Sequence, residues 1–373
     1  MKTSVLVVLF LPLIVAAQAE DKPVRAVTDP GVVTTRQSIT PAGAQAVFQG
    51  RVYGIAFGAT VDEVWVLNAG HAVRLNWKNN HVEDRIAIDG SPGLQGIQFD
   101  SNSGQAYISS TKNRKVKLLA IENGRAKIVA EGIGDQIAGG VALAKNGTAV
   151  VPLIYNNTLA IVDIAKHSAQ PRTRTSAVIG IAPFGAAINT QGTVAYVSNW
   201  GGRLPKTGDI TARTGLLPEA DRVVVDSRGI ASTGTVTRVD LASGQVTHTI
   251  QVGLHPMAIL WDEPRNLVYV ANGNSDSVSV IDAMQNRLVN TIAIQPFGIK
   301  TPGIAPTALA ISGDGARLFV ACGGLNAVAV FDTGSGKLLG LIPTAWYPNG
   351  LALEPGGDAL EASHGLVDVA ESR

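Results

Sequence analysis

The sequence has only one cysteine, Cys322, and a single thiol cannot form an intramolecular disulfide. Stability must therefore come from buried apolar side chains and from backbone pairing between strands. Cys322 lies in the apolar stretch RLFVACGG, where neither a His nor an Arg adjoins it to lower the pKa of the thiol. We therefore expect a buried, unreactive thiol and not a nucleophile.

An excess of charge of either sign is also missing. Lysine and arginine number 30 against 29 aspartates and glutamates, which leaves a formal net charge of +1. Binding to nucleic acid needs a basic field, so it is not expected as the main task of this chain. With 46% hydrophobic and only 16% charged residues, the sequence can fill a large core and is not typical of a disordered protein.

The N-terminus carries an apolar run, Val5 to Ala16, that is too short for a typical membrane span. It follows Lys2 and precedes Ala17-Gln18-Ala19, which has the small-x-small form of a cleavage site. We predict a signal peptide at 1–19, a flexible segment at 20–31, and export to the periplasm or outside the cell, with no membrane attachment after cleavage. An uncleaved N-terminal anchor is the alternative.

A repeat fills most of the remaining chain. The stretch LVYVANGNSDSVSVIDAMQNRLVNTIAI (267–294) holds three short apolar runs separated by small polar breaks, and the same unit returns along the chain. Its equivalent positions recur about every 42 to 50 residues apart from one gap, which is the period of a propeller blade. They are Trp65, Tyr107, Val150, Tyr196, Tyr269 and Phe319. The runs are short, β-branched and bounded by glycine, which excludes a helical solenoid.

Each unit, with the apolar run that precedes it, offers four short strands, and six complete units lie between about Phe48 and Thr344. A seventh starts at YPNGLALEPGG and lacks one strand, whereas VVTTRQSIT (32–40) is an alternating strand without a unit of its own. We therefore predict one all-β domain at 32–373. It is a seven-bladed β-propeller of four-stranded blades, closed by pairing of the N-terminal strand with the C-terminal blade. The alternative is six blades with a loose C-terminal tail.

The Tyr-Val-x-Asn motif occurs at 269–272 and 196–199, and SVSVID follows the first of these. In these motifs the sequence resembles the YVTN-repeat (YncE-like) β-propeller family over nearly the whole mature chain. RQSITPAG and IPTAWYPNGLALEPGG further resemble propellers that precede an alkaline-phosphatase-type phosphoesterase domain. We find no such domain in this sequence and expect a stand-alone or truncated relative. The resemblance therefore implies the fold and assigns no catalytic residue.

The longest connections are expected on one face of this propeller. An insert at 201–234 separates the second and third strands of the fourth unit, and QPFGIKTPGIAP (295–306) joins two blades on the same face. Long loops on a rigid scaffold commonly bind partners, although bracing the structure is an alternative role. Aromatic and cationic side chains on this face are our candidate ligand-binding residues: Trp200, Arg203, Lys206, His255, Lys300, Trp346 and Tyr347.

The starts of the inner strands should surround the mouth of the axial channel. The residues expected there are Arg51, Gln95, Gln136, Pro183, His255, Pro306 and Tyr347. Only His255 is a natural acid–base group, so it is the one candidate for catalysis. Its context HPMAI matches APFGA and YPNGL, however, which makes a structural rim residue the simpler interpretation.

Motifs for catalysis, cofactors and metals are incomplete. TGSGKLL lacks the first glycine of a phosphate loop, and GIG at 132–134 lacks the third glycine of a dinucleotide site. The six histidines are scattered, without metal-ligand spacing. Asn68, Asn199 and Asn272 recur at the ends of second strands, where an amide can satisfy backbone groups at a turn. We therefore predict no cofactor and assign no metal-ligating residue, while the sequence leaves open whether the central channel holds a metal.

These observations predict an exported, non-catalytic propeller that binds a protein partner or a small ligand through the face carrying the two long loops. A hydrolase is the first alternative, either lactonase-like or a truncated relative of the phosphoesterase-linked proteins. A structural or surface-layer role is the second. The sequence leaves the oligomeric state open.

Overall fold

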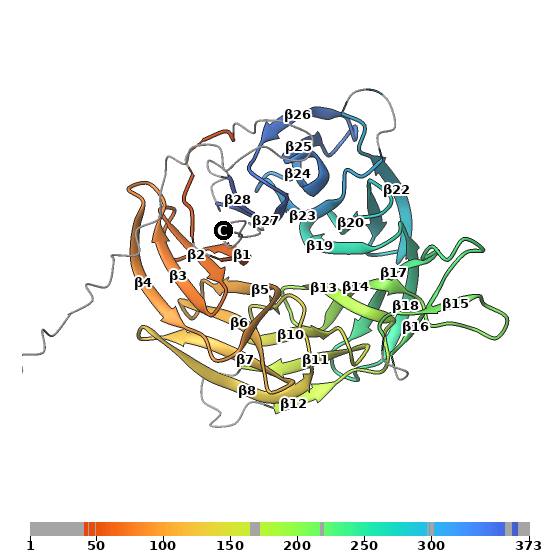
Figure 1. Ribbon diagram of the computed structural model, residues 1–373, viewed down its shortest axis with the longest axis horizontal. Helices are drawn as coiled ribbons and strands as arrows, with labels where there is room; N and C mark the ends of the chain where they lie inside the picture. Colours follow the sequence, from red (N-terminus) through yellow and green to blue (C-terminus); the bar gives the residue numbers. More distant parts are fainter. Residues whose placement is uncertain are drawn as a thin grey trace, which may run out of the picture.

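The computed structural model is a ring of small antiparallel sheets around a central axis (Figure 1). It describes residues 41–43, 45–48, 50–164, 172–216, 220–296, 298, 302–354 and 360–364. Six sheets have four strands each and follow one another in chain order, so they are the blades of an all-β propeller. Helices in these residues are limited to two 3₁₀ turns, Glu263–Arg265 (η1) and Gly323–Leu325 (η2), and no helix there is long and apolar enough to cross a membrane.

In each blade the first strand lies nearest the axis and the last lies at the outer rim. Blades 1 to 3 consist of β1 (Val52–Phe57), β2 (Glu63–Asn68), β3 (His71–Asn76) and β4 (His81–Ala87); β5 (Ser91–Asp100), β6 (Gln105–Lys112), β7 (Lys115–Glu122) and β8 (Arg125–Asp135); and β9 (Ala142–Leu143), β10 (Thr148–Leu153), β11 (Thr158–Asp163) and β12 (Arg172–Thr175). Blades 4 to 6 consist of β13 (Ile181–Ile188), β14 (Val194–Gly202), β17 (Gly234–Asp240) and β18 (Val246–Val252); β19 (Pro256–Asp262), β20 (Leu267–Asn272), β21 (Ser277–Asp282) and β22 (Arg287–Ala293); and β23 (Pro306–Ile311), β24 (Arg317–Cys322), β25 (Ala327–Asp332) and β26 (Leu338–Pro343).

The core lies between the blades. Neighbouring blades cover both faces of the middle strands, so all six residues of β10 are buried, whereas the outer strand β22 buries only Ile292. The equivalent positions found in the repeat all fall on second strands, and two of them, Tyr196 and Tyr269, are among the largest fully buried side chains. Cys322 is buried as predicted, and burial raises the pKa of its thiol to about 12.

Tight turns join strands on the face where the inner strands end. In the β17–β18 turn, the backbone N–H and the hydroxyl of Ser243 donate to Asp240 Oδ1 at 2.8 and 2.6 Å. Ser335 and Asp332 repeat this arrangement in the β25–β26 turn. Gly244 then takes a positive φ of 71°, as the Asp-x-x-Ser-Gly pattern requires.

The C-terminal unit differs from the prediction. Its described residues form a two-stranded sheet, β27 (Pro348–Leu353) and β28 (Leu360–His364), and β27 packs between β23 and β1 (Figure 1). The structure thus has six four-stranded blades, and the prediction of seven is wrong. Further strands would have to come from residues after His364 or from 32–40. Both lie outside the described residues, and so does the predicted closure by the N-terminal strand.

The two-stranded sheet is not a loose tail either. Asn349 Nδ2 donates to the backbone carbonyl of Val52 in β1 at 3.4 Å, so the last inner strand is bonded to the first. The N-terminal end of the described chain lies nearby, because the Ala42 N–H donates to the Pro343 carbonyl at the end of β26 at 2.9 Å. These two hydrogen bonds bring the first and last described segments of the chain to one sector of the ring.

Candidate functional site

Both long connections leave the ring on the face at which the inner strands begin, called here the elaborated face. The insert follows Trp200, whose ring centroid lies 4.3 Å from that of His255, the residue before β19. The 294–305 connection is held by Asp276 of the β20–β21 turn. Its carboxylate accepts the backbone N–H groups of Gly303 and Ala305, both at 3.0 Å, and Ala305 immediately precedes β23.

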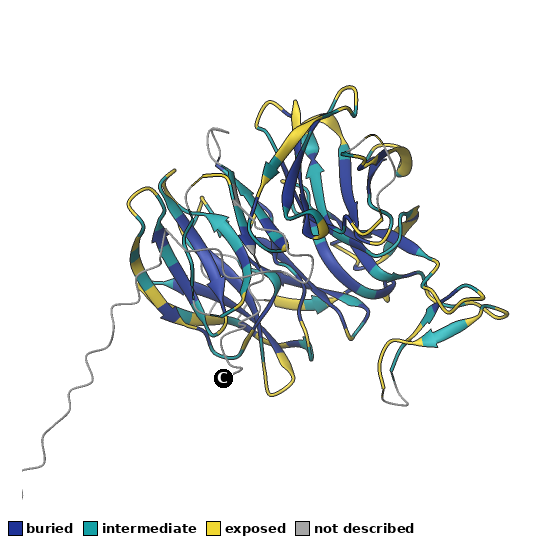
Figure 2. Ribbon diagram, turned by 45° about the horizontal axis from the view of Figure 1, so that its top comes forward, coloured by how far each residue is buried: buried dark blue, intermediate teal, exposed yellow. Residues whose placement is uncertain are grey.

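The insert folds into a hairpin that projects beyond the ring (Figures 1 and 2). β15 (Thr211–Arg213) pairs antiparallel with β16 (Arg222–Val224). On its other side β16 is continued by a bridge from Val225 to Ala231. Within the described residues β15 is therefore the open edge of this small sheet.

An ion pair stiffens the first part of the insert. The guanidinium of Arg203 donates twice to Asp209, from Nη1 to Oδ2 at 2.6 Å and from Nη2 to Oδ1 at 2.8 Å. The same carboxylate accepts the Lys206 N–H at 2.6 Å. The bonds from Arg203 are the largest cause that holds the pKa of Asp209 well below its usual range. Arg203 thus stabilises the fold of the insert. Lys206 is the other candidate ligand-binding residue of the insert, and its ammonium forms no ion pair within the described residues.

The hairpin is also attached to blade 3. Asn157, in the β10–β11 turn, donates from Nδ2 to Asp221 Oδ2 of the insert at 2.8 Å. Its own Oδ1 accepts the Ala182 N–H at the start of blade 4, again at 2.8 Å. One buried amide therefore fixes the insert relative to two blades, so the insert is positioned before any partner arrives.

Three rings stack beside the insert. Trp200 lies between Phe184, at 4.9 Å between centroids, and His255, at 4.3 Å. Burial against these rings lowers the pKa of His255 to about 4, so the imidazole is neutral at pH 7. No hydroxyl, thiol or carboxylate is hydrogen-bonded to His255 in the described part of the chain. The arrangement therefore gives this histidine a packing role and provides no nucleophile beside it.

The backbone at His255 supports the same interpretation. Its φ is +55°, an unusual value for a residue that is not glycine. The residues at the same place in other units share it, with +52° at Ala182, +51° at Ala305 and +47° at Tyr347. Because the value recurs at the start of four inner strands, it belongs to the repeat and is not strain specific to a catalytic group.

The remaining candidates lie elsewhere. Tyr347 is 48% exposed and covers Gly323, where an added Cβ would lie 2.8 Å from the tyrosine ring. Blade 6 separates it from the His255 stack. Trp346, next to it, is half-buried, and Lys300 lies outside the described residues. The predicted aromatic rim is thus divided between two sectors of the elaborated face.

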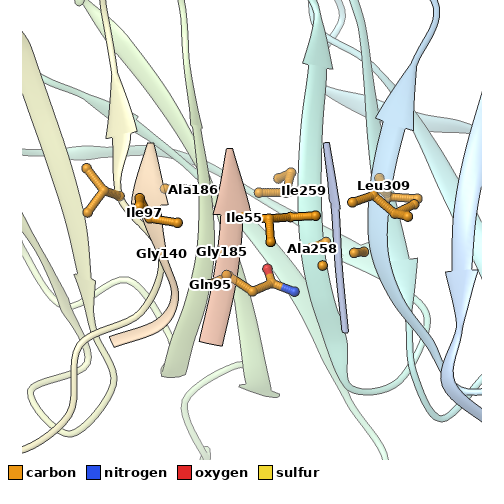
Figure 3. Close-up of a pocket in the computed structure, with 14 residues that line it drawn as sticks. Ile55, Gln95, Ile97, Gly140, Gly185, Ala186, Ala258, Ile259 and Leu309 are labelled. Atoms are coloured by element: carbon orange, nitrogen blue, oxygen red, sulfur yellow. The ribbon is translucent and has the colours of Figure 1, made fainter. Parts of the chain in front are cut away.

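The axial channel contains a cavity of about 160 Å³ whose lining side chains are apolar except for Gln95, although polar atoms are exposed in its wall (Figure 3). Every blade and the C-terminal unit contribute residues from the inner strand or, in blade 3, from just before it. They are Gly54, Ile55, Gln95, Ile97, Gly140, Val141, Gly185, Ala186, Ala258, Ile259, Ala308, Leu309, Gly350 and Leu351. Since Gln95 is the only polar side chain among them, the channel offers little to orient a polar ligand.

Gln95 was predicted at the start of an inner strand. It lies within β5 instead, and its side chain crosses the channel. Its Nε2 donates to the carbonyls of Thr307 at 3.0 Å and Asn349 at 2.9 Å, in blade 6 and the C-terminal unit. The cause is a large bulge in β5. Pro92 pairs with Ser110 and Ile97 with Ile108, so β5 advances by five residues where β6 advances by two. Inner strands such as β1 and β23 carry one extra residue at this bulge, whereas β5 carries three. The two additional residues in SPGLQGIQF were the sequence signal for this feature.

Exposed large hydrophobic side chains gather on the elaborated face. Eight of the fifteen in the described residues lie there: Ile137, Tyr155, Val178, Leu204, Ile210, Leu216, Ile230 and Tyr347. Four belong to the insert, and Leu216 is fully exposed at 100%. The other seven are spread over outer strands and turns of the opposite face: Val61, Ile128, Met284, Leu288, Val289, Leu339 and Leu341. Apolar groups concentrated in this way mark interaction surfaces.

Of the recurring asparagines, Asn199 bonds a backbone carbonyl as expected, whereas Asn272 bonds side-chain hydroxyls. The buried Oδ1 atoms of both accept no hydrogen bond from the described residues. Asn199 Nδ2 lies within hydrogen-bond distance of the Ile179 carbonyl and of two threonine hydroxyls of β17. Asn272 Nδ2 lies within hydrogen-bond distance of the hydroxyls of Ser277 and Ser279 of β21. Among the described residues no group of three His, Cys, Asp or Glu side chains is placed to hold a metal ion.

Comparison with known proteins supports the fold. No protein-family model matches the chain, and no curated protein matches it in sequence. Among solved structures 1432 chains match, one of which is hydrazine synthase from Kuenenia stuttgartiensis. Its TM-score is 0.66 at 12% sequence identity, and the match covers 87% of this chain and 96% of that chain. At this identity the likeness shows the β-propeller fold alone, since such folds carry many unrelated functions.

Proposed function

We propose that the chain is a non-catalytic scaffold that binds a protein partner through its elaborated face, with the 201–234 insert as the main contact. The observation that carries this proposal is the concentration of exposed apolar side chains on an insert that ion pairs and an amide hold in place. Protein interfaces form on such protruding, pre-organised surfaces. Small ligands prefer concave sites with several placed polar side chains, and the axial cavity is small and has Gln95 as the one polar side chain among its lining residues.

The proposal is tested by comparing pull-downs with the intact chain and with a chain that lacks 203–231. Gly202 and Gly234 end and begin paired strands, so the deletion leaves a short connection between β14 and β17. We expect loss of the recovered partner from a chain that still folds, with some fall in the melting temperature because Val224, Val225 and the bond from Asn157 to Asp221 are removed. Met284→Ser, on the opposite face, is the matched control and should recover the partner normally. Equal recovery with and without the insert would contradict the proposal.

The proposal includes export and membership of the YVTN-repeat family. Export is supported by the apolar run at residues 5–16 and the small-x-small site that follows it. Mass spectrometry of the protein purified from the periplasm or the medium should find an N-terminus near Glu20. A cytoplasmic protein that keeps residues 1–19 would contradict this part, without affecting the binding surface.

A further inference from the structure

The charge on the hairpin is unusually arranged. The register of β15 and β16 places Arg213 directly opposite Arg222. In an antiparallel pair the side chains of opposed residues lie on the same face, so two like charges extend from one face of the hairpin, an arrangement that destabilises an isolated hairpin. An anionic group bound between them would remove this repulsion.

Cations on the insert are incompletely neutralised within the described residues. Arg203 is paired with Asp209 and Arg228 with Asp226, but Lys206, Arg213 and Arg222 form no ion pair there. Arg222 donates from Nε and Nη2 to the hydroxyl and carbonyl of Thr211, at 2.7 and 2.9 Å, and these are neutral groups. Most of its N–H donors therefore stay open, and Glu219 of the connecting loop lies outside the described residues.

The edge of β15 has backbone groups available for a further strand. The Ile210 carbonyl accepts the Val225 N–H at 2.9 Å, and the Thr214 N–H donates to the Asp221 carbonyl at 2.8 Å. The backbone groups of Ile210 and Thr214 therefore face β16. Antiparallel geometry then directs the backbone groups of the alternate residues, Thr211 and Arg213, away from β16. The Thr211 carbonyl already accepts from Arg222, so the Thr211 N–H and both backbone groups of Arg213 are the ones available at this edge within the described residues. An extended segment added at this edge would present alternate side chains to the arginine face and to the face of Ile210.

Apolar groups continue from the hairpin onto blade 3. Ile154 donates its N–H to the Ile137 carbonyl at 3.3 Å, and Ile179 donates to the Asn157 carbonyl at 2.9 Å. These bonds hold the exposed residues Ile137, Tyr155 and Val178 at one rim of blade 3, the rim to which Asp221 ties the hairpin. The surface thus joins cations that have no ion pair within the described residues to an apolar rim.

We infer that the β15–β16 hairpin binds an extended segment of the partner in which acidic residues alternate with apolar ones. The acidic residues would lie against Arg213 and Arg222, and the apolar ones against Ile210 and the blade 3 rim. This inference rests on the proposed function and specifies the chemistry of the partner. A flat anionic membrane surface fits less well, because an edge strand with open backbone groups is matched by another polypeptide.

The test uses the full mature chain and a labelled twelve-residue peptide in which Glu and Leu alternate. Fluorescence anisotropy should detect binding that weakens as salt rises. The double variant Arg213→Glu with Arg222→Glu should bind about tenfold more weakly, because two attractive contacts become repulsive. Lys145→Glu, an exposed charge change in the β9–β10 turn of the opposite face, should bind as the unaltered chain does. Circular dichroism checks folding, and Arg213→Gln with Arg222→Gln replaces the double variant if that one does not fold.

Several outcomes would overturn the inference. These are an absence of peptide binding, equal binding by the charge-reversed variant, equal binding of a matched peptide in which Lys alternates with Leu, and binding to phosphatidylglycerol vesicles in place of the peptide. None of these contradicts the proposed function, which fails only if deletion of 203–231 leaves partner recovery unchanged.

Discussion

The two faces of the ring differ in how they connect their strands. On the opposite face, fully described connections are short turns closed by aspartates such as Asp240 and Asp332, or by asparagines with positive φ such as Asn286. The elaborated face carries the insert, the 294–305 connection, the His255 stack and most of the exposed apolar side chains. Since short turns suffice to join the strands, the additional chain on one face points to a role other than folding.

The largest expected effect concerns the ring and not the elaborated face. Tyr196→Ala removes a fully buried ring whose hydroxyl donates to Asn286 Oδ1 at 2.6 Å. We expect a loss of about 3–5 kcal/mol in the free energy of unfolding, measured by urea titration, from the cavity that remains. A loss below about 1 kcal/mol would show that the core between blades 4 and 5 is not packed as described.

Gln95→Ala should have the next largest effect on stability. The change removes two hydrogen bonds across the channel and leaves the carbonyls of Thr307 and Asn349 without that donor. We expect a loss of about 1–3 kcal/mol in the free energy of unfolding. Gln136→Ala is the matched control, because Gln136 also has a positive φ, and it should lose clearly less. Equal losses would show that backbone strain and not the cross-channel contact matters.

His255 makes stability depend on pH. Its pKa in the folded chain, about 4, lies below the ordinary value of 6.5, so between these values the unfolded chain binds a proton that the folded chain does not. Stability should therefore fall as the pH is lowered from 6.5 to about 4 and level off below that. Between pH 7 and 5 we expect the free energy of unfolding to fall by roughly 1 kcal/mol, after allowing for the partial exposure of the imidazole.

His255→Asn is the variant for this measurement, because asparagine tolerates a positive φ and does not titrate in this range. Urea midpoints at several pH values should show a smaller fall for the variant than for the unaltered chain. Parallel profiles would mean that His255 is not desolvated by its stack with Trp200.

Leu216→Ser should have the smallest effect on stability, below about 0.5 kcal/mol, because the side chain is fully exposed. Met284→Ser, at 76% exposure on the opposite face, should be equally harmless. In a partner-binding assay, however, only the Leu216 variant should lose affinity. A loss with Met284→Ser would contradict the contrast between the faces.

Much of the ring could be predicted from the sequence because the same pattern of strands recurs in each unit of the repeat. The second-strand positions, the Asp-x-x-Ser-Gly turns and the buried Cys322 follow from alternation, turn chemistry and apolar context. The number of blades could not be predicted, because a sequence pattern typical of a strand does not determine whether that segment pairs with a neighbouring strand. The path of Gln95 depends on a bulge whose direction only the surrounding blades determine.

The elaborated face was predictable only in part. The position of the insert follows from where the repeat is interrupted, but its contacts do not. Arg203 was expected to meet a ligand and is bonded to Asp209, six residues away. The opposition of Arg213 and Arg222 depends on the register of a three-residue hairpin, and nothing in the sequence specifies so short a pairing.

Site-specific photocrosslinking in the native host tests the central claim most directly. A photoreactive amino acid at position 216 lies on the insert, and the same group at position 284 lies on the opposite face with comparable exposure. We predict one discrete protein adduct from position 216 and none from position 284. An adduct from position 284 alone, or the same adduct from both positions, would contradict binding through the elaborated face.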